Sequence, residues 1–143
     1  MREKHIKIKK HKEKSKLIVS HEDKLLVLQN ESNPMVYRLF GGSLKKSESP
    51  EEALIRELFE EAKVKLSKQS IAYHRSTTID LGDKQRLTKH YFLYKNNTKP
   101  FMSPESLKLL NATWLAWEDT LKFLEKSDKK IVKELFKPCT LNC

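Results

Sequence analysis

The sequence predicts an α/β protein in which a mixed β-sheet carries helices on its faces. Three observations support this fold class. Apolar runs typical of buried strands occupy residues 16–40, a helix with strong start signals follows at 50–62, and further strand-like segments precede a helical pattern over 118–136. Strands and helices in this order indicate packed layers of sheet and helix. The chain of 143 residues is long enough for one domain with such a layered core.

The N-terminal segment is strongly basic. Residues 1–16 contain eight Lys or Arg and two Glu, so they carry +6 of the net charge of +10. Ile6 and Ile8 alternate there with Lys and His, which predicts either a short edge strand or a disordered arm. We therefore divide the chain into a basic arm or edge strand over residues 1–15 and a single domain over residues 16–143. A positive segment suits polyanions such as nucleotides or RNA, but it also simply keeps a protein soluble.

The first strand-like segments surround a short polar turn. Residues 16–20 and 24–29 are apolar runs, and their arrangement predicts a hairpin of buried strands. Residues 35–40 form a third strand candidate, which leads directly into Gly41 and Gly42. The chain therefore passes from a strand to two adjacent glycines just before the helix.

The helix at residues 50–62 has a clear start. Ser49 suits the N-cap, Pro50 suits the first helical position, and Glu52 stands three residues after the cap, as a capping box requires. An apolar stripe at helical spacing should face the sheet, and it consists of Ile55, Leu58 and Ala62.

The second half of the chain repeats these signals. Segments rich in β-branched and aromatic residues predict further strands, and a second Ser-Pro-Glu predicts a helix start. The expected elements are strands at 69–79 and 86–95 joined by a turn at 80–85, a short helix after 103–104, a strand at 113–117, and a helix over 118–136 broken near 127–128.

Three acids fall on one side of the first helix. Glu57, Glu60 and Glu61 are spaced i, i+3 and i+4, so they are stacked over a single turn. Crowded carboxylates repel each other unless a cation lies between them. Oxygen ligands on a rigid element suit Mg²⁺ or Mn²⁺, which keep positions open for water and phosphate oxygens. The spacing therefore predicts a magnesium site for phosphate chemistry.

The glycines, the helix and these acids together form a longer pattern. It resembles the Nudix box of the Nudix hydrolase superfamily: Gly, five residues, Glu, seven residues, Arg-Glu and an aliphatic, any residue, Glu-Glu, any residue, Gly and an aliphatic. The matching positions are Gly42, Glu48, Arg56, Glu57, Leu58, Glu60, Glu61 and Val64. Lys63 stands where the family has its late glycine, and Phe40 stands where a proline is frequent. Neither departure removes a ligand, and the order of elements extends the resemblance over about residues 16–136.

The resemblance implies an α/β/α sandwich, with helices on both faces of a mixed sheet, that hydrolyses a nucleoside diphosphate derivative. Water attacks phosphorus with the help of Mg²⁺, for which Mn²⁺ can substitute. The implied metal ligands are Glu57, Glu60, Glu61 and the Gly41 carbonyl. A helix acid, here Glu57, or an acid from a later loop serves as general base.

The resemblance also implies supporting roles. Arg56 and Glu48 orient the ligands, so Glu48, Arg56, Glu57 and Glu61 form the expected catalytic set. The expected substrate contacts are Arg38, Gly42, Lys45 and Glu105. Simpler interpretations stay open, because Arg56 can pair with an acid on a solvated helix face and Glu48 can be a loop acid favoured by the helix dipole.

Three functions follow from this resemblance. The first is hydrolysis of a pyrophosphate linkage in a small nucleotide such as a nucleoside triphosphate. The second acts on the cap or triphosphate at an RNA 5′ end, aided by the basic arm. The third is a non-catalytic nucleotide-binding module, which the intact helix acids argue against. The absence of a proline between Pro50 and Pro100 disfavours ADP-ribose as the substrate.

Other features of the sequence concern the cellular compartment and the oligomeric state of the protein. The sequence shows neither the apolar start of a signal peptide nor an apolar run long enough to span a membrane. Cys139 and Cys143 match no metal or redox motif, so free thiols in a reducing cytoplasm are expected. Monomer and homodimer both remain open.

Overall fold

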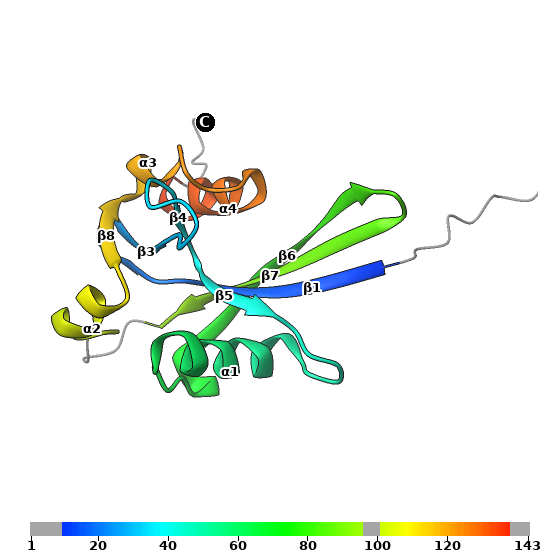
Figure 1. The fold of residues 1–143 in the computed structure, drawn as a ribbon, viewed down its shortest axis with the longest axis horizontal. Coiled ribbons are helices and arrows are strands. Elements are labelled where there is room, and N and C mark those ends of the chain that lie inside the picture. Colours follow the sequence, from blue (N-terminus) through cyan, green and yellow to red (C-terminus); the bar gives the residue numbers. More distant parts are fainter. Residues whose placement is uncertain (1–9, 96–100, 138–143) are drawn as a thin grey trace, which may run out of the picture.

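The computed structural model describes residues 10–95 and 101–137, and its strands form two four-stranded sheets (Figure 1). The first sheet has the order β5-β1-β7-β6. Its β1 and β7 run parallel, whereas β1 with β5 and β6 with β7 run antiparallel, so this sheet is mixed. These strands are β1 (Lys10–Ile18), β5 (Phe40–Ser43), β6 (Ile71–Gly82) and β7 (Gln85–Tyr94).

The second sheet is antiparallel and takes its strands from both halves of the chain. They are β2 (Ser20–His21), β3 (Lys24–Gln29), β4 (Tyr37–Arg38) and β8 (Ala112–Ala116), and β3 pairs with the other three. The expected hairpin of residues 16–20 and 24–29 is confirmed only next to its turn, where β2 pairs with β3. Residues 16–18 belong instead to β1 of the first sheet. The expected strand at 35–40 is likewise divided between β4 and β5. The reason is that Tyr37 and Arg38 pair with β3 of the second sheet, whereas residues from Phe40 onward pair with β1 of the first, so the chain changes sheet at Leu39.

Helices cover both faces of the first sheet, as the α/β/α expectation requires. In Figure 1, α1 (Pro50–Ala62) and α4 (Lys126–Phe136) lie on opposite sides of the strands. Two hydrophobic cores result, one containing Leu54 and Leu58 of α1 and the other containing Ile131 and Val132 of α4. Within the described ranges, no helix has the length and apolar character needed to cross a membrane.

The helix α1 begins and ends as its sequence signals predict. The Ser49 hydroxyl accepts a hydrogen bond from the Glu52 amide at 3.1 Å, and the Glu52 carboxylate accepts one from the Ser49 amide at 2.8 Å. This is the expected capping box. At the other end Lys63 adopts a left-handed conformation with φ +57°, the conformation that the family's glycine would favour.

The strand β1 contains residues 10–15 of the segment that the sequence predicts to be an arm or an edge strand. β7 pairs with the whole of β1, whereas β5 pairs only with residues 14–17. Residues 10–13 therefore lie at an edge of the sheet, which is one of the two expected alternatives, and residues 14–15 lie inside it. Residues 1–9 lie outside the described part. Figure 1 shows β1, β6 and β7 extending together beyond the helices. Side-chain hydrogen bonds cross this extension in two rows, His11–Thr88–Thr78 and Glu13–His90–Ser76.

The remaining elements follow the predicted order with shifted bounds. The β6–β7 turn falls at Asp83 and Lys84, which both have positive φ, as a two-residue hairpin turn requires. Trp117 begins a helix and does not end β8, and the predicted break near residues 127–128 lies earlier, before Lys126. The helices concerned are α2 (Pro104–Leu109), α3 (Trp117–Thr120) and the 3₁₀ helix η1 (Lys68–Ser70), which precedes β6. Cys139 and Cys143 lie outside the described residues.

Candidate active site

The three predicted metal ligands lie on α1, away from the side that packs in the core. Glu57 and Glu61 are largely covered, with side-chain exposures of 23% and 18%, whereas Glu60 is 53% exposed. Each carboxylate accepts a hydrogen bond from an arginine. Arg56 donates to Glu57 at 3.0 Å and to Glu60 at 3.1 Å, and Arg38 donates to Glu61 at 2.8 Å.

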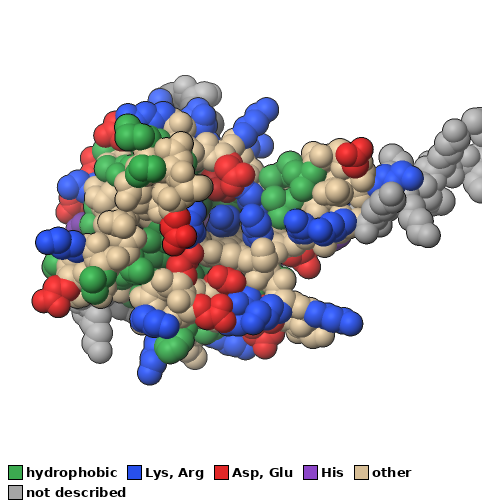
Figure 2. All heavy atoms as spheres, viewed as in Figure 1, with side chains coloured by type: hydrophobic (Ala, Val, Ile, Leu, Met, Phe, Trp, Pro, Cys, Tyr) green, Lys and Arg blue, Asp and Glu red, His purple; other side chains and the backbone are tan. Residues whose placement is uncertain are grey.

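Arg56 links α1 to the loop that precedes it. Its Nε and Nη2 donate to the two carboxylate oxygens of Glu48 at 2.6 and 2.9 Å, which is a bidentate pair. Its Nη2 also donates to the Ser43 carbonyl at 2.9 Å. The contacts of Arg56 therefore reach well beyond the solvated helix face. Figure 2 shows acidic and basic side chains gathered together over α1 and the loop before it.

The Arg56–Glu48 pair is held in its charged form. The hydrogen bond from Arg56 lowers the pKa of Glu48 to about 2, and a hydrogen bond from the Lys45 amide at 2.7 Å acts in the same direction. In turn, the hydrogen bond to Glu48 raises the pKa of the Arg56 guanidinium above its ordinary value. Both groups therefore remain ionised at neutral pH, which keeps the loop tied to the helix.

The two adjacent glycines each touch one carboxylate. Gly41 has φ +136°, and its amide donates to Glu61 Oε1 at 3.3 Å. A Cβ on Gly41 would lie 2.0 Å from the Ser15 carbonyl oxygen, so β5 can approach β1 this closely only with glycine. A Cβ on Gly42 would lie 2.3 Å from Glu57 Cδ. The Glu57 carboxylate thus occupies the space that a side chain at position 42 would need.

The carboxylates match Mg²⁺ in ligand type and in total charge, although they do not converge on one point in this structure. In residues 10–95 and 101–137, no group of three or more Asp, Glu, His or Cys side chains converges on a point that could hold a metal ion. Arg56 holds Glu57 and Glu60, while Arg38 holds Glu61. With Glu48, the network contains four carboxylates and two guanidiniums, an excess of two negative charges. Carboxylate oxygens with this charge fit one divalent hard cation.

Three of the four predicted substrate contacts adjoin this network. Arg38 pairs with Glu61, Gly42 packs on the Glu57 carboxylate, and the Lys45 amide bonds to Glu48. Glu105 is different, because it lies exposed in the first turn of α2. In the described part of the chain it forms no hydrogen bond or salt bridge with the network.

Two features of the site were missed by sequence reasoning. The Ser43 carbonyl, which receives a hydrogen bond from Arg56, directly follows the glycine pair. Lys16 lies opposite Gly41 in the ladder between β1 and β5, with only 7% of its surface exposed. The position of Ser43 could have been suspected from its proximity to Gly42, whereas the position of Lys16 depends on strand pairing that no local signal reveals.

A family model and several solved structures are similar to this chain. The family model described as the NUDIX domain matches residues 13–135. The comparison with curated proteins gives no match.

Solved structures similar to this chain have the same fold at low sequence identity. The Escherichia coli ORF135 protein is 18% identical with a TM-score of 0.64, over 88% of this chain and 89% of that one. A MutT protein from Bacillus halodurans is 20% identical with a TM-score of 0.64, over 88% and 82%. The Caenorhabditis elegans Ap4A hydrolase is 20% identical with a TM-score of 0.60, over 87% and 95%.

Proposed function

Because the chain belongs to the Nudix hydrolase family, whose members act on nucleoside diphosphate derivatives, we propose that it hydrolyses a pyrophosphate linkage in a small nucleotide with the help of Mg²⁺. A nucleoside triphosphate is the substrate class that we favour, and the cytoplasm is the compartment that we propose. The similar solved structures include an Ap4A hydrolase and a dihydroneopterin triphosphate pyrophosphohydrolase, whose names both denote small polyphosphorylated molecules.

The observation that carries this proposal is the charged network around Arg56. Arg56 binds Glu48 and also Glu57, whose carboxylate lies against Gly42. Arg38 binds Glu61, which accepts a hydrogen bond from the Gly41 amide. Four carboxylates and two guanidiniums leave two negative charges uncompensated, and oxygen is their only donor type. Glu57, Glu60, Glu61 and the Gly41 carbonyl would hold the Mg²⁺, which would neutralise phosphate charge and lower the pKa of the attacking water.

The other residues of the site would position the ligands, accept a proton and bind phosphate. Arg56 and Glu48 fix the loop against α1, so the Glu57 carboxylate keeps its place on Gly42. We assign Glu57 as the general base that takes the proton of the attacking water. Arg38 forms a salt bridge with Glu61 in this structure. Its guanidinium, with several N–H donors, would suit a phosphate oxygen if Arg38 left the Glu61 carboxylate.

RNA is the second candidate substrate, because basic residues continue along β1. Lys10 and Lys12 are exposed on the extension that β1 shares with β6 and β7. Positive charge on a protruding sheet would attract an RNA backbone without reading its sequence. A strong preference for 5′-triphosphorylated or capped RNA over free nucleotides would favour this candidate.

A substrate panel with product analysis tests the proposal. Deoxynucleoside triphosphates, ADP-ribose, dinucleoside polyphosphates and capped RNA are incubated with Mg²⁺ or with EDTA. We expect turnover of a small nucleotide that EDTA abolishes, and Glu61→Gln should lower kcat by orders of magnitude. Glu51→Gln is the matched control, because Glu51 lies on the same helix outside the network. A folded Glu61→Gln protein with near-normal turnover contradicts the metal assignment.

A further inference from the structure

Lys16 is a buried lysine whose ammonium has no hydrogen-bond or salt-bridge partner in the described part of the chain. Its side chain lies on β1, opposite Gly41 of β5 and Tyr91 of β7. Only 7% of its surface is exposed, yet none of residues 10–95 and 101–137 forms a hydrogen bond or a salt bridge with its ammonium. Burial lowers the pKa of this ammonium from its ordinary value. Burying a charge without a partner is costly, so this arrangement calls for an explanation.

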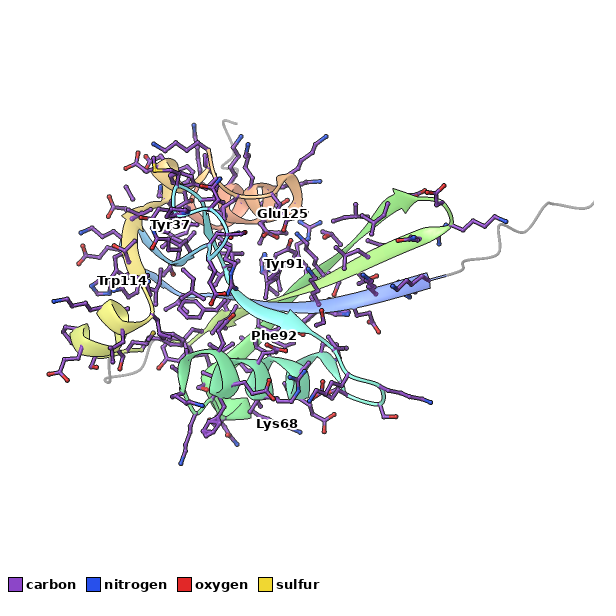
Figure 3. All side chains as sticks on the ribbon, in the orientation of Figure 1. Tyr37, Lys68, Tyr91, Phe92, Trp114 and Glu125 are labelled. Atoms are coloured by element: carbon purple, nitrogen blue, oxygen red, sulfur yellow. The ribbon has the colours of Figure 1, made fainter. Side chains whose placement is uncertain are left out.

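The neighbouring acids are already engaged by another lysine. Lys89 of β7 is 1% exposed, and its ammonium donates to Glu125, Ser127 and Asp128 at 2.9 to 3.1 Å. These three bonds use all the donors that an ammonium has. Asp128 also accepts a hydrogen bond from the Tyr91 hydroxyl. Figure 3 shows Tyr91 pointing toward the α4 side, where Glu125 lies, while Phe92 points toward α1.

The charge on this face of the sheet is therefore positive. Lys14 lies opposite Lys89 in the parallel ladder, so it shares the face with Lys16 and Lys89. Three ammonium groups stand against two carboxylates, those of Glu125 and Asp128. Figure 2 shows Lys and Arg side chains gathered between the α4 side and the α1 side of the molecule, with acidic side chains around them.

Gly41 of the edge strand β5 lies between the backbone of Lys16 and the Glu61 carboxylate. The Gly41 amide bonds to Glu61, and a Cβ on Gly41 would come within 3.0 Å of the Lys16 Cα. Because Gly41 has no side chain, nothing on that residue screens Lys16 from a ligand at the network. Adjacent strands lie about 5 Å apart. A polyphosphate group bound near Glu61 would reach the α4 face, where Lys16 lies, by crossing the sheet edge at Gly41.

We propose that Lys16 is a substrate-binding residue whose ammonium binds an anionic phosphate oxygen of the nucleotide. This inference rests on the proposed function and refines its substrate class. The carboxylates attract a phosphate only through a metal ion, whereas Lys16 attracts it directly. A substrate with a further charged phosphate can use both, so Lys16 selects nucleoside triphosphates and dinucleoside polyphosphates over substrates with a single pyrophosphate. Binding would supply the partner that the buried ammonium lacks among residues 10–95 and 101–137.

Lys16→Met tests this role, since methionine keeps the length of the side chain and removes its charge. Isothermal titration with inorganic tripolyphosphate measures binding without turnover. We expect affinity to fall about tenfold or more, as for loss of a charge-assisted hydrogen bond, and KM for nucleoside triphosphates to rise by a similar factor while kcat changes less than about threefold. Lys24→Met is the matched control, because Lys24 is an exposed lysine at the start of β3. Its effect should be less than about twofold.

Two further measurements separate binding from structure. Lys16→Arg keeps the charge and should retain most of the affinity, which a purely structural loss would not predict. If Lys16→Met fails to fold, the comparison of Lys16→Gln with Lys16→Arg replaces it. Unchanged tripolyphosphate affinity in a folded neutral variant overturns the role of Lys16 even when nucleotide turnover upholds the proposed function. Absence of tripolyphosphate binding by the native protein also overturns it, and the substrate panel alone decides the function.

Discussion

The Glu57 carboxylate fills the space that a side chain on Gly42 would need, since a Cβ there would lie 2.3 Å from Glu57 Cδ. The glycine before the helix therefore determines where an expected ligand and base can lie. This relationship joins two positions that are separated by the whole loop and the first turns of α1, and it makes the function of Gly42 testable.

Gly42→Ala should displace the Glu57 carboxylate and reduce kcat by roughly 100-fold, the usual effect of misplacing a reacting group by about 1 Å. Steady-state kinetics on the best nucleotide substrate measures this. Gly82→Ala is the control, because a Cβ on Gly82 has open space around it and Gly82 lies at the far end of β6. Since Gly82 has φ +81°, its variant should lose some stability but keep its kcat. Equal kcat in the two variants would contradict the proposed place of Glu57 in the reaction.

Glu48→Gln should weaken the hold of the loop on α1 and reduce activity by about 10- to 100-fold, as for residues that orient metal ligands. Its effect on stability should depend on pH. The pKa of Glu48 is lowered from 4.5 to about 2 by its hydrogen bond with Arg56. A carboxylate with a lowered pKa stabilises the folded state above its unfolded pKa, and this contribution disappears as the pH falls through the folded value.

The difference in thermal unfolding temperature between wild type and Glu48→Gln should therefore be full above about pH 4.5 and vanish toward pH 2. Circular dichroism melts across this range measure the difference. A pH-independent difference would show that the ionised pair is not its cause.

Asp128→Ala should destabilise the protein by about 3–5 kcal/mol, because it leaves the buried Lys89 ammonium without its most deeply buried partner. Chemical denaturation measures the free energy of unfolding. Glu125→Ala provides a close comparison, since Glu125 bonds to the same ammonium but its side chain is 69% exposed. We expect that variant to lose less than about 1 kcal/mol. Equal losses would show that burial does not distinguish the two acids.

Lys63→Gly should stabilise the protein by about 1 kcal/mol, because glycine adopts the left-handed conformation of the α1 C-cap without steric strain. Denaturant unfolding measures this gain, and kcat should not change. Lys65→Gly is the control, since Lys65 is an exposed neighbour whose φ is not positive. Glycine at that position should bring no gain, so stabilisation by both variants would argue against a conformational cause at Lys63.

Much of the site was predictable because its signals are local. The capping box at Ser49, the length of α1 and the grouping of Glu57, Glu60 and Glu61 depend on residues only a few positions apart. Their spacing on a 3.6-residue period places them without knowledge of the rest of the chain. What the local pattern could not show is that Arg38 holds Glu61, since these residues are 23 positions apart and belong to different elements.

The strands were less predictable for a related reason. Alternating residues reveal the faces of a strand but not its partners. The N-terminal residues read as an arm or an edge because their long row of lysines is typical of both. Pairing with β7 joins residues 10–13 to an edge of the sheet, and the His11–Thr88 hydrogen bond there spans a separation of 77 residues. Only residues 14–17, with which β5 also pairs, lie inside the sheet.

The sequence by itself therefore determined the family pattern, the acid-bearing helix and its two ends, because each follows from contacts within a few residues. Only the tertiary structure decided the place of β1, the pairing of Arg38 with Glu61 and the burial of Lys16 beside Gly41. Burial and strand pairing depend on residues brought together from distant parts of the chain. In the sequence Lys16 looks like the polar end of a strand, and it becomes a buried lysine opposite Gly41 once β5 pairs with β1.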